Sequence, residues 1–215
     1  MTNTLFTIGY SSRTIDDFIA LLKQYKITAL CDVRSMPYSN RNPQFNREFL
    51  KSTLKSHNID YVFLGEELGA RPSDHSCFID GKAVYQKIAS SILFKAGLER
   101  VAVGVQKGYV LALMCAEKDP LTCHRSILIC RNLRDRPINI LHIIDNDTTE
   151  TQAELEKSLI ARLKLYPDLF RALDTNALIE RAYEIQGDRI AYVEKGGTEQ
   201  DEKLAEMVGE EHERY

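Results

Sequence analysis

The sequence predicts an α/β fold: one domain with an open, mostly parallel sheet, helices on both faces and further helices at the C-terminal end. Short apolar segments alternate along the chain with longer amphipathic ones. Strands that alternate with helices need crossover connections, which makes neighbouring strands parallel. The length of 215 residues, 44% of them hydrophobic, suits a single domain of this kind.

Each element is expected from its own pattern. Short apolar runs predict strands over 5–8, 28–33, 60–64, 109–114 and 138–143. Amphipathic spacing predicts helices over 14–25, 46–56, 82–103, 122–134, 150–165 and 175–186. Thr14, with Asp17 three residues later, predicts a capped start for the first helix. The stretches 34–43 and 65–80 are expected to be an irregular segment and a long loop.

The charge is unevenly distributed along the chain. The formal net charge is -3, from 28 Lys and Arg against 31 Asp and Glu. Residues 194–215 hold eight acids and three bases, a net charge of -5, which leaves +2 for the other 193 residues. We therefore expect an α/β domain over 1–193 and a flexible acidic tail over 194–215. The balance excludes a wholly basic, histone-like nucleic-acid binder but permits a local basic site.

The cysteines and the start of the chain favour a cytoplasmic protein. No apolar run is long enough to span a bilayer, and the first residues lack a signal-peptide pattern. The number of cysteines is odd and their spacing irregular, which favours free thiols over a disulfide scaffold. They are Cys31, Cys77, Cys115, Cys123 and Cys130. We expect no contact with a membrane, and the sequence predicts neither a particular cofactor nor an oligomeric state.

The densest group of chemically active residues lies between Cys115 and Arg125, after the most apolar predicted strand. In a doubly wound fold, ligands bind beyond the carboxyl ends of the strands. Cys123 is expected in the first turn of a helix, where the dipole favours a thiolate. His124 is a candidate base or proton relay, and Arg125 a candidate anion ligand. Packing of the cysteines as small buried residues fits less well, because Glu, Lys, Asp, His and Arg crowd the same segment.

Three forms of this site can be distinguished, of which the first is absent and the other two remain open. A phosphatase-type loop needs an arginine six residues after its cysteine, but Leu121 stands at that distance from Cys115. Zinc commonly takes four ligands at a structural site, and Cys115, Cys123 and His124 provide three. A redox pair of the two cysteines would not have the C-x-x-C spacing of thioredoxin-like motifs.

Further candidates follow the other predicted strands. Gly9, Tyr10 and Ser11 form a turn that can approach a phosphate, although the turn lacks a nucleotide-binding fingerprint and an ordinary cap explains it equally well. Asp32 and Arg34 leave the second strand together, so one of them can face the crevice. Glu67, in the long loop, is a candidate acid or base, although an exposed acid is usually only solvated. His142, inside the last strand, is expected to be a satisfied core residue.

Taken in order, these segments resemble the bacterial and archaeal family known as domain of unknown function 488. The resemblance covers roughly residues 5–193. It rests on 7–11, 32–34 with Pro37 and Ser39, 45–50, 67–69, 115–118, 123–125 and 142–143. It implies a compact α/β domain with a pocket built from these motifs, and it associates the chain with nucleotide or nucleic-acid metabolism and repair.

The leading hypothesis is an enzyme acting on a phosphate-bearing substrate, a nucleotide or a nucleic acid. Cys115, Cys123, His124 and Glu67 are its candidate catalytic residues. The candidate substrate-binding residues are Gly9, Tyr10, Ser11, Asp32, Arg34 and Arg125. The alternatives are a non-catalytic module that binds nucleotides or DNA, and a thiol-redox or metal-binding protein. The expected partner is an anionic small molecule or a nucleic acid.

Overall fold

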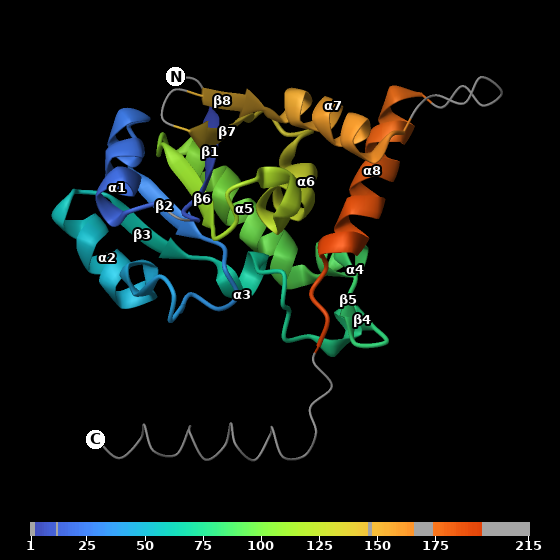
Figure 1. Ribbon diagram of the computed structural model, residues 1–215, viewed down its shortest axis with the longest axis horizontal. Coiled ribbons are helices and arrows are strands. Elements are labelled where there is room, and N and C mark those ends of the chain that lie inside the picture. Colours follow the sequence, from blue (N-terminus) through green and yellow to red (C-terminus); the bar gives the residue numbers. More distant parts are fainter. Residues whose placement is uncertain (1–2, 12, 146–147, 166–173, 195–215) are drawn as a thin grey trace, which may run out of the picture.

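The computed structural model describes residues 3–11, 13–145, 148–165 and 174–194. Its main strands are β1 Thr4–Gly9, β2 Ala29–Asp32, β3 Asp60–Phe63, β6 Leu111–Cys115, β7 Asn139–Asp145 and β8 Thr148–Thr151. These strands form one sheet in the order β3-β2-β6-β1-β7-β8 (Figure 1). Every neighbouring pair from β3 to β7 is parallel, and β8 joins β7 antiparallel. The predicted α/β fold with a mostly parallel sheet is confirmed.

Helices connect these strands. They are α1 Ile15–Gln24, α2 Arg47–Ser56, α3 Gly65–Leu68, α4 Tyr85–Ser90, α5 Ile92–Gln106, α6 Arg131–Leu133, α7 Gln152–Leu163 and α8 Thr175–Ile190. A π-helix, Arg125–Cys130, precedes α6, and short 3-10 helices lie at Pro43–Phe45, His75–Cys77 and Pro120–Thr122. The expected cap of α1 is present, because the Thr14 side chain accepts a hydrogen bond from the Asp17 amide at 3.1 Å.

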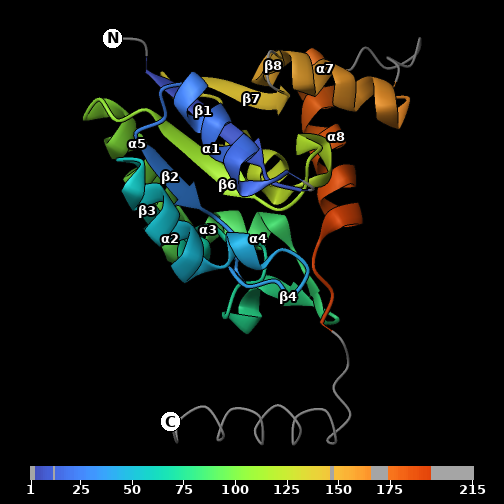
Figure 2. The ribbon, with the colours of Figure 1, turned by 60° about the vertical axis from the view of Figure 1, so that its left-hand side comes forward.

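The sheet is buried on both faces, and alternate residues of each strand belong to different cores. Leu30 in β2 and Met114 in β6 pack with α1 and α2. Cys31 and Leu113, from the same two strands, pack instead with α5, the π-helix and the C-terminal helices. This two-residue alternation is the expected geometry of a strand covered on each side. In Figure 2, α1 and α2 lie on the near side of the sheet and α5 on the far side.

The helix predicted over 82–103 is not continuous. Its first residues form the strand β5 Lys82–Ala83, which pairs antiparallel with β4 Phe78–Ile79 across a turn at Asp80 and Gly81, both with positive φ. The remainder is divided at Ser91, whose extended backbone ends α4 and whose side chain caps α5 by accepting from the Phe94 amide. Serine competes locally for backbone hydrogen bonds, which explains the break.

Two further helix boundaries differ from the prediction. The helix expected over 122–134 begins after Cys123, and its first part is the π-helix. The helix expected over 150–165 begins at Gln152, because residues 148–151 form β8 on the edge of β7. Thr151 and Glu154 form a capping box at this boundary. The loop expected over 65–80 holds α3, a 3-10 turn and β4.

A buried chain of hydrogen bonds ties the sheet to the C-terminal helices. Thr7 Oγ1 lies 2.9 Å from His142 Nδ1, and His142 Nε2 lies 2.8 Å from Gln152 Oε1. The Gln152 amide donates to the hydroxyl of Tyr183, which donates to Glu156 at 2.8 Å. His142 is completely buried and satisfied, as the sequence predicted. Figure 1 shows α7 and α8 packed beside this end of the sheet.

The C-terminal end of the described chain runs back to the β4–β5 hairpin. The Ala83 amide donates to the carbonyl of Tyr192 at 2.8 Å, and the Glu194 amide donates to Gly81 at 2.8 Å. The rest of the expected acidic tail, 195–215, lies outside the described residues. In the part of the chain that is described, no helix has the length and apolar character needed to cross a membrane.

Candidate functional site

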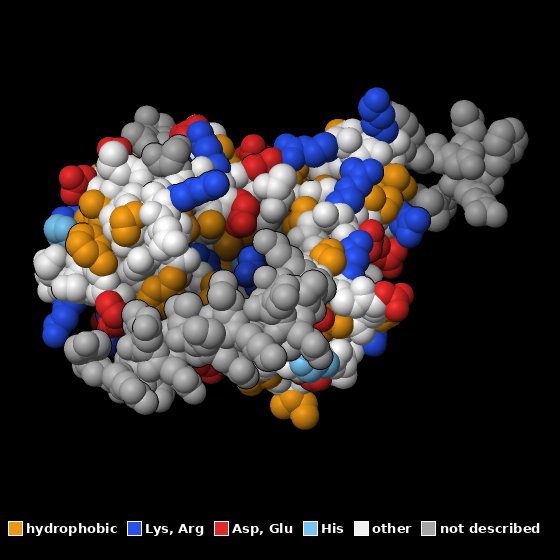
Figure 3. Space-filling model, turned by 60° about the horizontal axis from the view of Figure 1, so that its bottom comes forward, with side chains coloured by type: hydrophobic (Ala, Val, Ile, Leu, Met, Phe, Trp, Pro, Cys, Tyr) orange, Lys and Arg blue, Asp and Glu red, His pale blue; other side chains and the backbone are white. Residues whose placement is uncertain are grey.

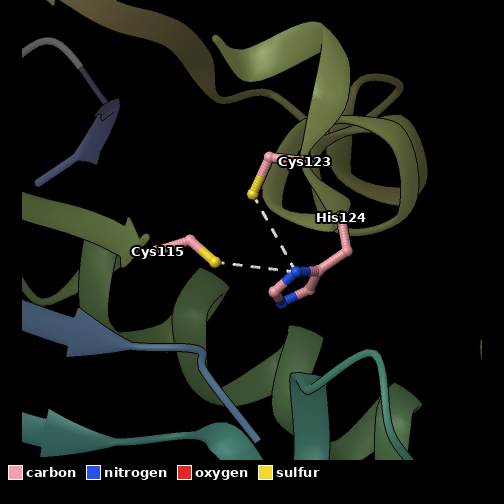
Figure 4. Close-up of side chains that lie close together, drawn as sticks. All are labelled: Cys115, Cys123 and His124. Carbon is pink, nitrogen blue, oxygen red and sulfur yellow. Dashed lines mark hydrogen bonds between the residues drawn. The ribbon is translucent and has the colours of Figure 1, made fainter. Parts of the chain in front are cut away.

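Cys115, Cys123 and His124 lie together at the carboxyl end of β6. Cys115 is the last residue of the strand, and the chain then folds back through the 3-10 turn Pro120–Thr122. Asp119 stabilises this turn, because its carboxylate accepts from the Leu121 amide at 2.8 Å. The turn places residues 123 and 124 beside 115, and in Figure 4 the three side chains point toward one another.

The imidazole of His124 is oriented by the backbone of a neighbouring strand end. Its Nε2 lies 2.9 Å from the carbonyl oxygen of Val33, which can only accept, so Nε2 carries a proton. The other nitrogen, Nδ1, faces Cys115 Sγ at 3.8 Å and Cys123 Sγ at 3.9 Å (Figure 4). All three residues are buried. Nδ1 of His124 therefore lies close to both sulfur atoms.

Glu117 adds a carboxyl group to this cluster. The thiol of Cys115 donates to Glu117 Oε2 at 3.0 Å. Burial raises the pKa of the Glu117 carboxyl, so it takes up a proton more readily than an exposed glutamate. Glu117 belongs to the segment in which the sequence crowds charged residues, but no separate role for it was predicted. The spacing could have indicated it, because side chains two residues apart in an extended chain point to the same side.

The two thiols have opposite electrostatic tendencies. The hydrogen bond with Cys123, together with burial, raises the pKa of Cys115 well above its ordinary value. Burial also raises the pKa of Cys123, but hydrogen bonding from Cys115 and the charges of Arg125 and His124 outweigh it, so the pKa falls well below its ordinary value. Burial lowers the pKa of His124, but the hydrogen bond with Cys123 and the charge of Cys123 raise it more. The pKa of His124 therefore lies above its ordinary value. Cys123 is thus the thiol that ionises first.

Arg125 stabilises the loop that carries Cys115 and Glu117. Its guanidinium donates to the carbonyl oxygens of Glu117 at 2.6 Å and Lys118 at 2.9 Å, and the residue is 1% exposed. Its Nε is buried with no partner among the described residues. Arg125 does not line the pocket. In this structure it holds the loop in place and does not face a ligand in the pocket.

The turn after β1 holds the same loop from the other side. The Tyr10 amide donates to the carbonyl of Cys115 at 3.1 Å, and the Ser11 amide donates to that of Ala116 at 2.8 Å. A Cβ on Gly9 would lie 1.9 Å from the carbonyl oxygen of Glu117, so this position accepts no side chain. Tyr10 lines the pocket, whereas Gly9 and Ser11 do not.

Asp32 and Arg34 form a buried ion pair beneath the pocket. Arg34 Nε and Nη2 donate to the two carboxylate oxygens of Asp32 at 2.8 and 2.6 Å, and Nη2 also donates to the Phe45 carbonyl. Tyr61 donates a further hydrogen bond to Asp32 at 2.8 Å. Arg34 lines the pocket, and its Nη1 is buried without a partner in the described structure. Asp32 supports Arg34 and is not part of the wall.

One pocket of about 600 Å³ brings these residues together. Its wall is formed by Tyr10, 34–36, Tyr38, Ser39, Ala70, Arg71, Tyr85, 115–117, 122–124 and 190–193. Arg71 lies at this wall with its guanidinium 4.6 Å from the ring centre of Tyr192. Local periodicity could not identify Arg71, Tyr85 or Tyr192, because they come from distant segments that only the fold joins.

The structure does not bring Glu67 to this pocket. α3 turns Glu67 toward α5, where it forms an ion pair with Arg100 and packs against Gly97. Glu67 lines a different cavity, together with residues of the 72–74 and 90–93 segments. Its carboxylate is therefore occupied away from the cluster, and Glu117 is the acidic side chain beside Cys115.

Fold and site together define an α/β protein with a pocket at the carboxyl ends of its parallel strands and a Cys-Cys-His cluster in the pocket wall. Residues 14–131, more than half of the chain, match the family described as domain of unknown function DUF488, and the chain belongs to that family. Comparison with curated proteins and with solved structures gives no significant match. The matched range includes α1, β2, the Asp32–Arg34 pair and the whole cluster.

Proposed function

We propose that this protein is an enzyme that acts on a small phosphate-bearing substrate, such as a nucleotide, with Cys115, Cys123 and His124 as its reactive centre. The observation that carries the proposal is the convergence of two sulfur atoms and one oriented imidazole nitrogen in the wall of a pocket. Reactive groups of this kind in a concave site support a catalytic function. Glu117, rather than Glu67, is the acid or base proposed beside them.

Two arginines support an anionic substrate. The buried Nη1 of Arg34 lacks a partner in the described structure, so a ligand oxygen that reached it would satisfy a costly unpaired donor. Asp32 compensates the charge of Arg34, which therefore acts as an oriented donor more than as a free cation. Arg71 has no carboxylate partner among the described residues and supplies the uncompensated charge at the wall.

The size of the pocket and its surroundings favour a small substrate over a long nucleic acid. A volume of about 600 Å³ lies in the range that holds small ligands. On the part of the face in Figure 3 that the described residues occupy, acidic and basic side chains are interspersed. A polynucleotide backbone is usually bound by a continuous basic area. We therefore propose a nucleotide-sized ligand.

The proposal is tested by turnover with a matched pair of cysteine variants. The purified chain is incubated with nucleoside mono-, di- and triphosphates and with short oligonucleotides, and the products are separated by chromatography. We expect turnover of at least one nucleotide by the wild type and by Cys130→Ala, a core cysteine outside the pocket. Cys123→Ala should lose at least about a hundredfold in rate.

Two results would overturn this function. Equal rates for Cys123→Ala and wild type would remove the cluster from the chemistry. Salt-dependent binding of an oligonucleotide without any turnover would instead identify a non-catalytic binding module.

A further inference from the structure

The cluster has the dimensions of a metal site. Its three ligand atoms, the sulfurs of Cys115 and Cys123 and Nδ1 of His124, lie within 4.8 Å of one another. With Zn–S near 2.3 Å and Zn–N near 2.0 Å, tetrahedral coordination places sulfur and nitrogen about 3.6 Å apart. In the structure the two sulfur–nitrogen distances are 3.8 and 3.9 Å. Both sulfur–nitrogen distances therefore lie within a few tenths of an ångström of those around a bound ion.

The orientation of His124 supports the same conclusion. A histidine that binds a metal usually donates its other ring N–H to a carbonyl or carboxylate, which fixes the tautomer. The Nε2 of His124 has such a partner in the Val33 carbonyl. Nδ1 faces both sulfur atoms, whereas the Cys115 thiol donates its proton to Glu117, so hydrogen bonds within the cluster do not explain why all three atoms converge. A cation among the three atoms would satisfy all of them.

We propose that Cys115, Cys123 and His124 bind one zinc ion, whose fourth position opens into the pocket and holds water. This inference rests on the proposed function, because it names the group that the reactive centre uses. Two thiolates and an imidazole suit Zn²⁺, and three protein ligands with an open position are typical of catalytic zinc. Binding releases two protons from the cluster to solvent and leaves both sulfurs as thiolates and Nδ1 of His124 unprotonated, and the two thiolates neutralise the ion.

Glu117 becomes the proton acceptor of this centre. Its Oε2 accepts the Cys115 thiol in the described structure, and that hydrogen bond ends when Cys115 binds zinc as a thiolate. The freed carboxylate lines the same pocket as the three proposed ligands. Beside a bound zinc ion, Glu117 would be the carboxylate placed to accept a proton from bound water. Zinc lowers the pKa of bound water enough for this step near neutral pH.

A redox pair would use the two sulfurs but not the histidine. A Cys115–Cys123 disulfide leaves Nδ1 of His124 with no bonded partner, although the Val33 carbonyl holds it facing both sulfurs. The third donor therefore favours metal binding over disulfide formation.

Metal content and cobalt spectroscopy on the full chain test the inference. We expect the wild type, purified without chelators, to hold about one zinc per chain. Exchange with Co²⁺ should give the charge-transfer and d–d absorption of a tetrahedral site with thiolate ligands. Cys115→Ser, Cys123→Ser and His124→Ala should each weaken zinc affinity by at least about tenfold. Cys130→Ser, a core cysteine in the π-helix, should retain the metal.

Glu117→Gln separates the proton acceptor from the ligands. This variant should hold zinc as the wild type does while losing turnover of the nucleotide found active. Loss of zinc from Glu117→Gln would overturn its assignment as an acceptor and make it a ligand.

The failures of the two proposals are distinguishable. Wild-type protein that turns over substrate while holding no zinc, and that loses turnover when iodoacetamide alkylates Cys123, would overturn the metal site and leave the enzyme. Stoichiometric zinc with no turnover would support the metal site and overturn the enzyme. An intact mass showing a Cys115–Cys123 disulfide in protein purified without oxidant would overturn the zinc assignment.

Discussion

Arg34 shows how the chain keeps a buried cation oriented. The bidentate pairing with Asp32 and the Phe45 carbonyl fix its guanidinium below the pocket. A buried ion pair adds little net stability, but removal of one partner leaves an uncompensated charge. The pairing therefore fixes the orientation of the guanidinium, and Nη1 remains buried without a partner in the described structure.

Arg71 offers the cleaner test of anion binding, because it has no ion pair among the described residues. Arg71→Ala should raise KM for the nucleotide substrate by about fivefold, the effect of one partly exposed charge. The maximal rate should remain unchanged, since Arg71 does not touch the cluster. Steady-state kinetics measure both constants. Arg181→Ala removes an equal charge from α8, outside the pocket, and a comparable KM change there would contradict a specific contact.

His142 makes stability dependent on pH. Burial lowers its pKa to about 4, from 6.5 when unperturbed, so the unfolded chain binds the proton more tightly. The stability from neutral His142 is fully present above pH 6.5 and is lost as the pH falls toward 4. The shift corresponds to about 3 kcal/mol in the free energy of unfolding. Denaturant titrations between pH 7 and 4 should show this decline in the wild type.

The same denaturant titrations on two variants show whether His142 is the group that causes the pH dependence. His142→Gln should remove this contribution from the pH dependence, while His75→Gln, an exposed residue, should retain it. An unchanged pH profile in His142→Gln would show that another group is responsible.

At the scale of elements, the sequence was most informative where pattern and burial agree. The five parallel strands were predicted because each is a short apolar run followed by an amphipathic segment. β8 was missed because Thr148–Thr151 lacks an apolar run and is a strand only through pairing with β7. The break at Ser91 was missed because apolar spacing continues across it. A hydrogen bond to the Phe94 amide decides the boundary, and periodicity does not record it.

The division between α4 and α5 can be tested at its cap. Ser91→Ala removes the oxygen that accepts from the Phe94 amide and should lower the free energy of unfolding by about 1 kcal/mol. Ser90→Ala, one residue earlier, removes only a hydroxyl that donates to the Gln86 carbonyl and should cost less. Equal effects in chemical denaturation would argue against the cap.

For the site as well, the local sequence pattern predicted the cluster, whereas the rest of the pocket wall depends on the fold. Cys115, Cys123 and His124 were found because chemically active residues crowd one segment after a strand. Glu67 was proposed from its loop, but its direction depends on packing of α3 against α5. The rest of the wall comes from segments far apart in the chain, including 190–193, which return across the β4–β5 hairpin.

At the scale of the whole molecule, the return of the chain to the hairpin predicts that the domain ends near Glu194. The last described backbone contact joins Glu194 to Gly81, so a chain ending at Glu194 keeps every contact described here. This truncation changes the formal net charge from -3 to +1, because residues 195–215 contribute -4. We expect a melting temperature within about 2 °C of the full chain. A fall of several degrees would show that the acidic segment stabilises the fold.

The convergence of Cys115, Cys123 and His124 is the claim on which the function rests. A crystal structure of the full chain, with anomalous diffraction measured at the zinc edge, tests it most directly. We predict one anomalous peak bonded to Cys115 Sγ, Cys123 Sγ and His124 Nδ1, with its open side toward Arg34 and Glu117 in the pocket. The three side chains separated, or the two sulfurs joined with His124 turned away, would contradict the account.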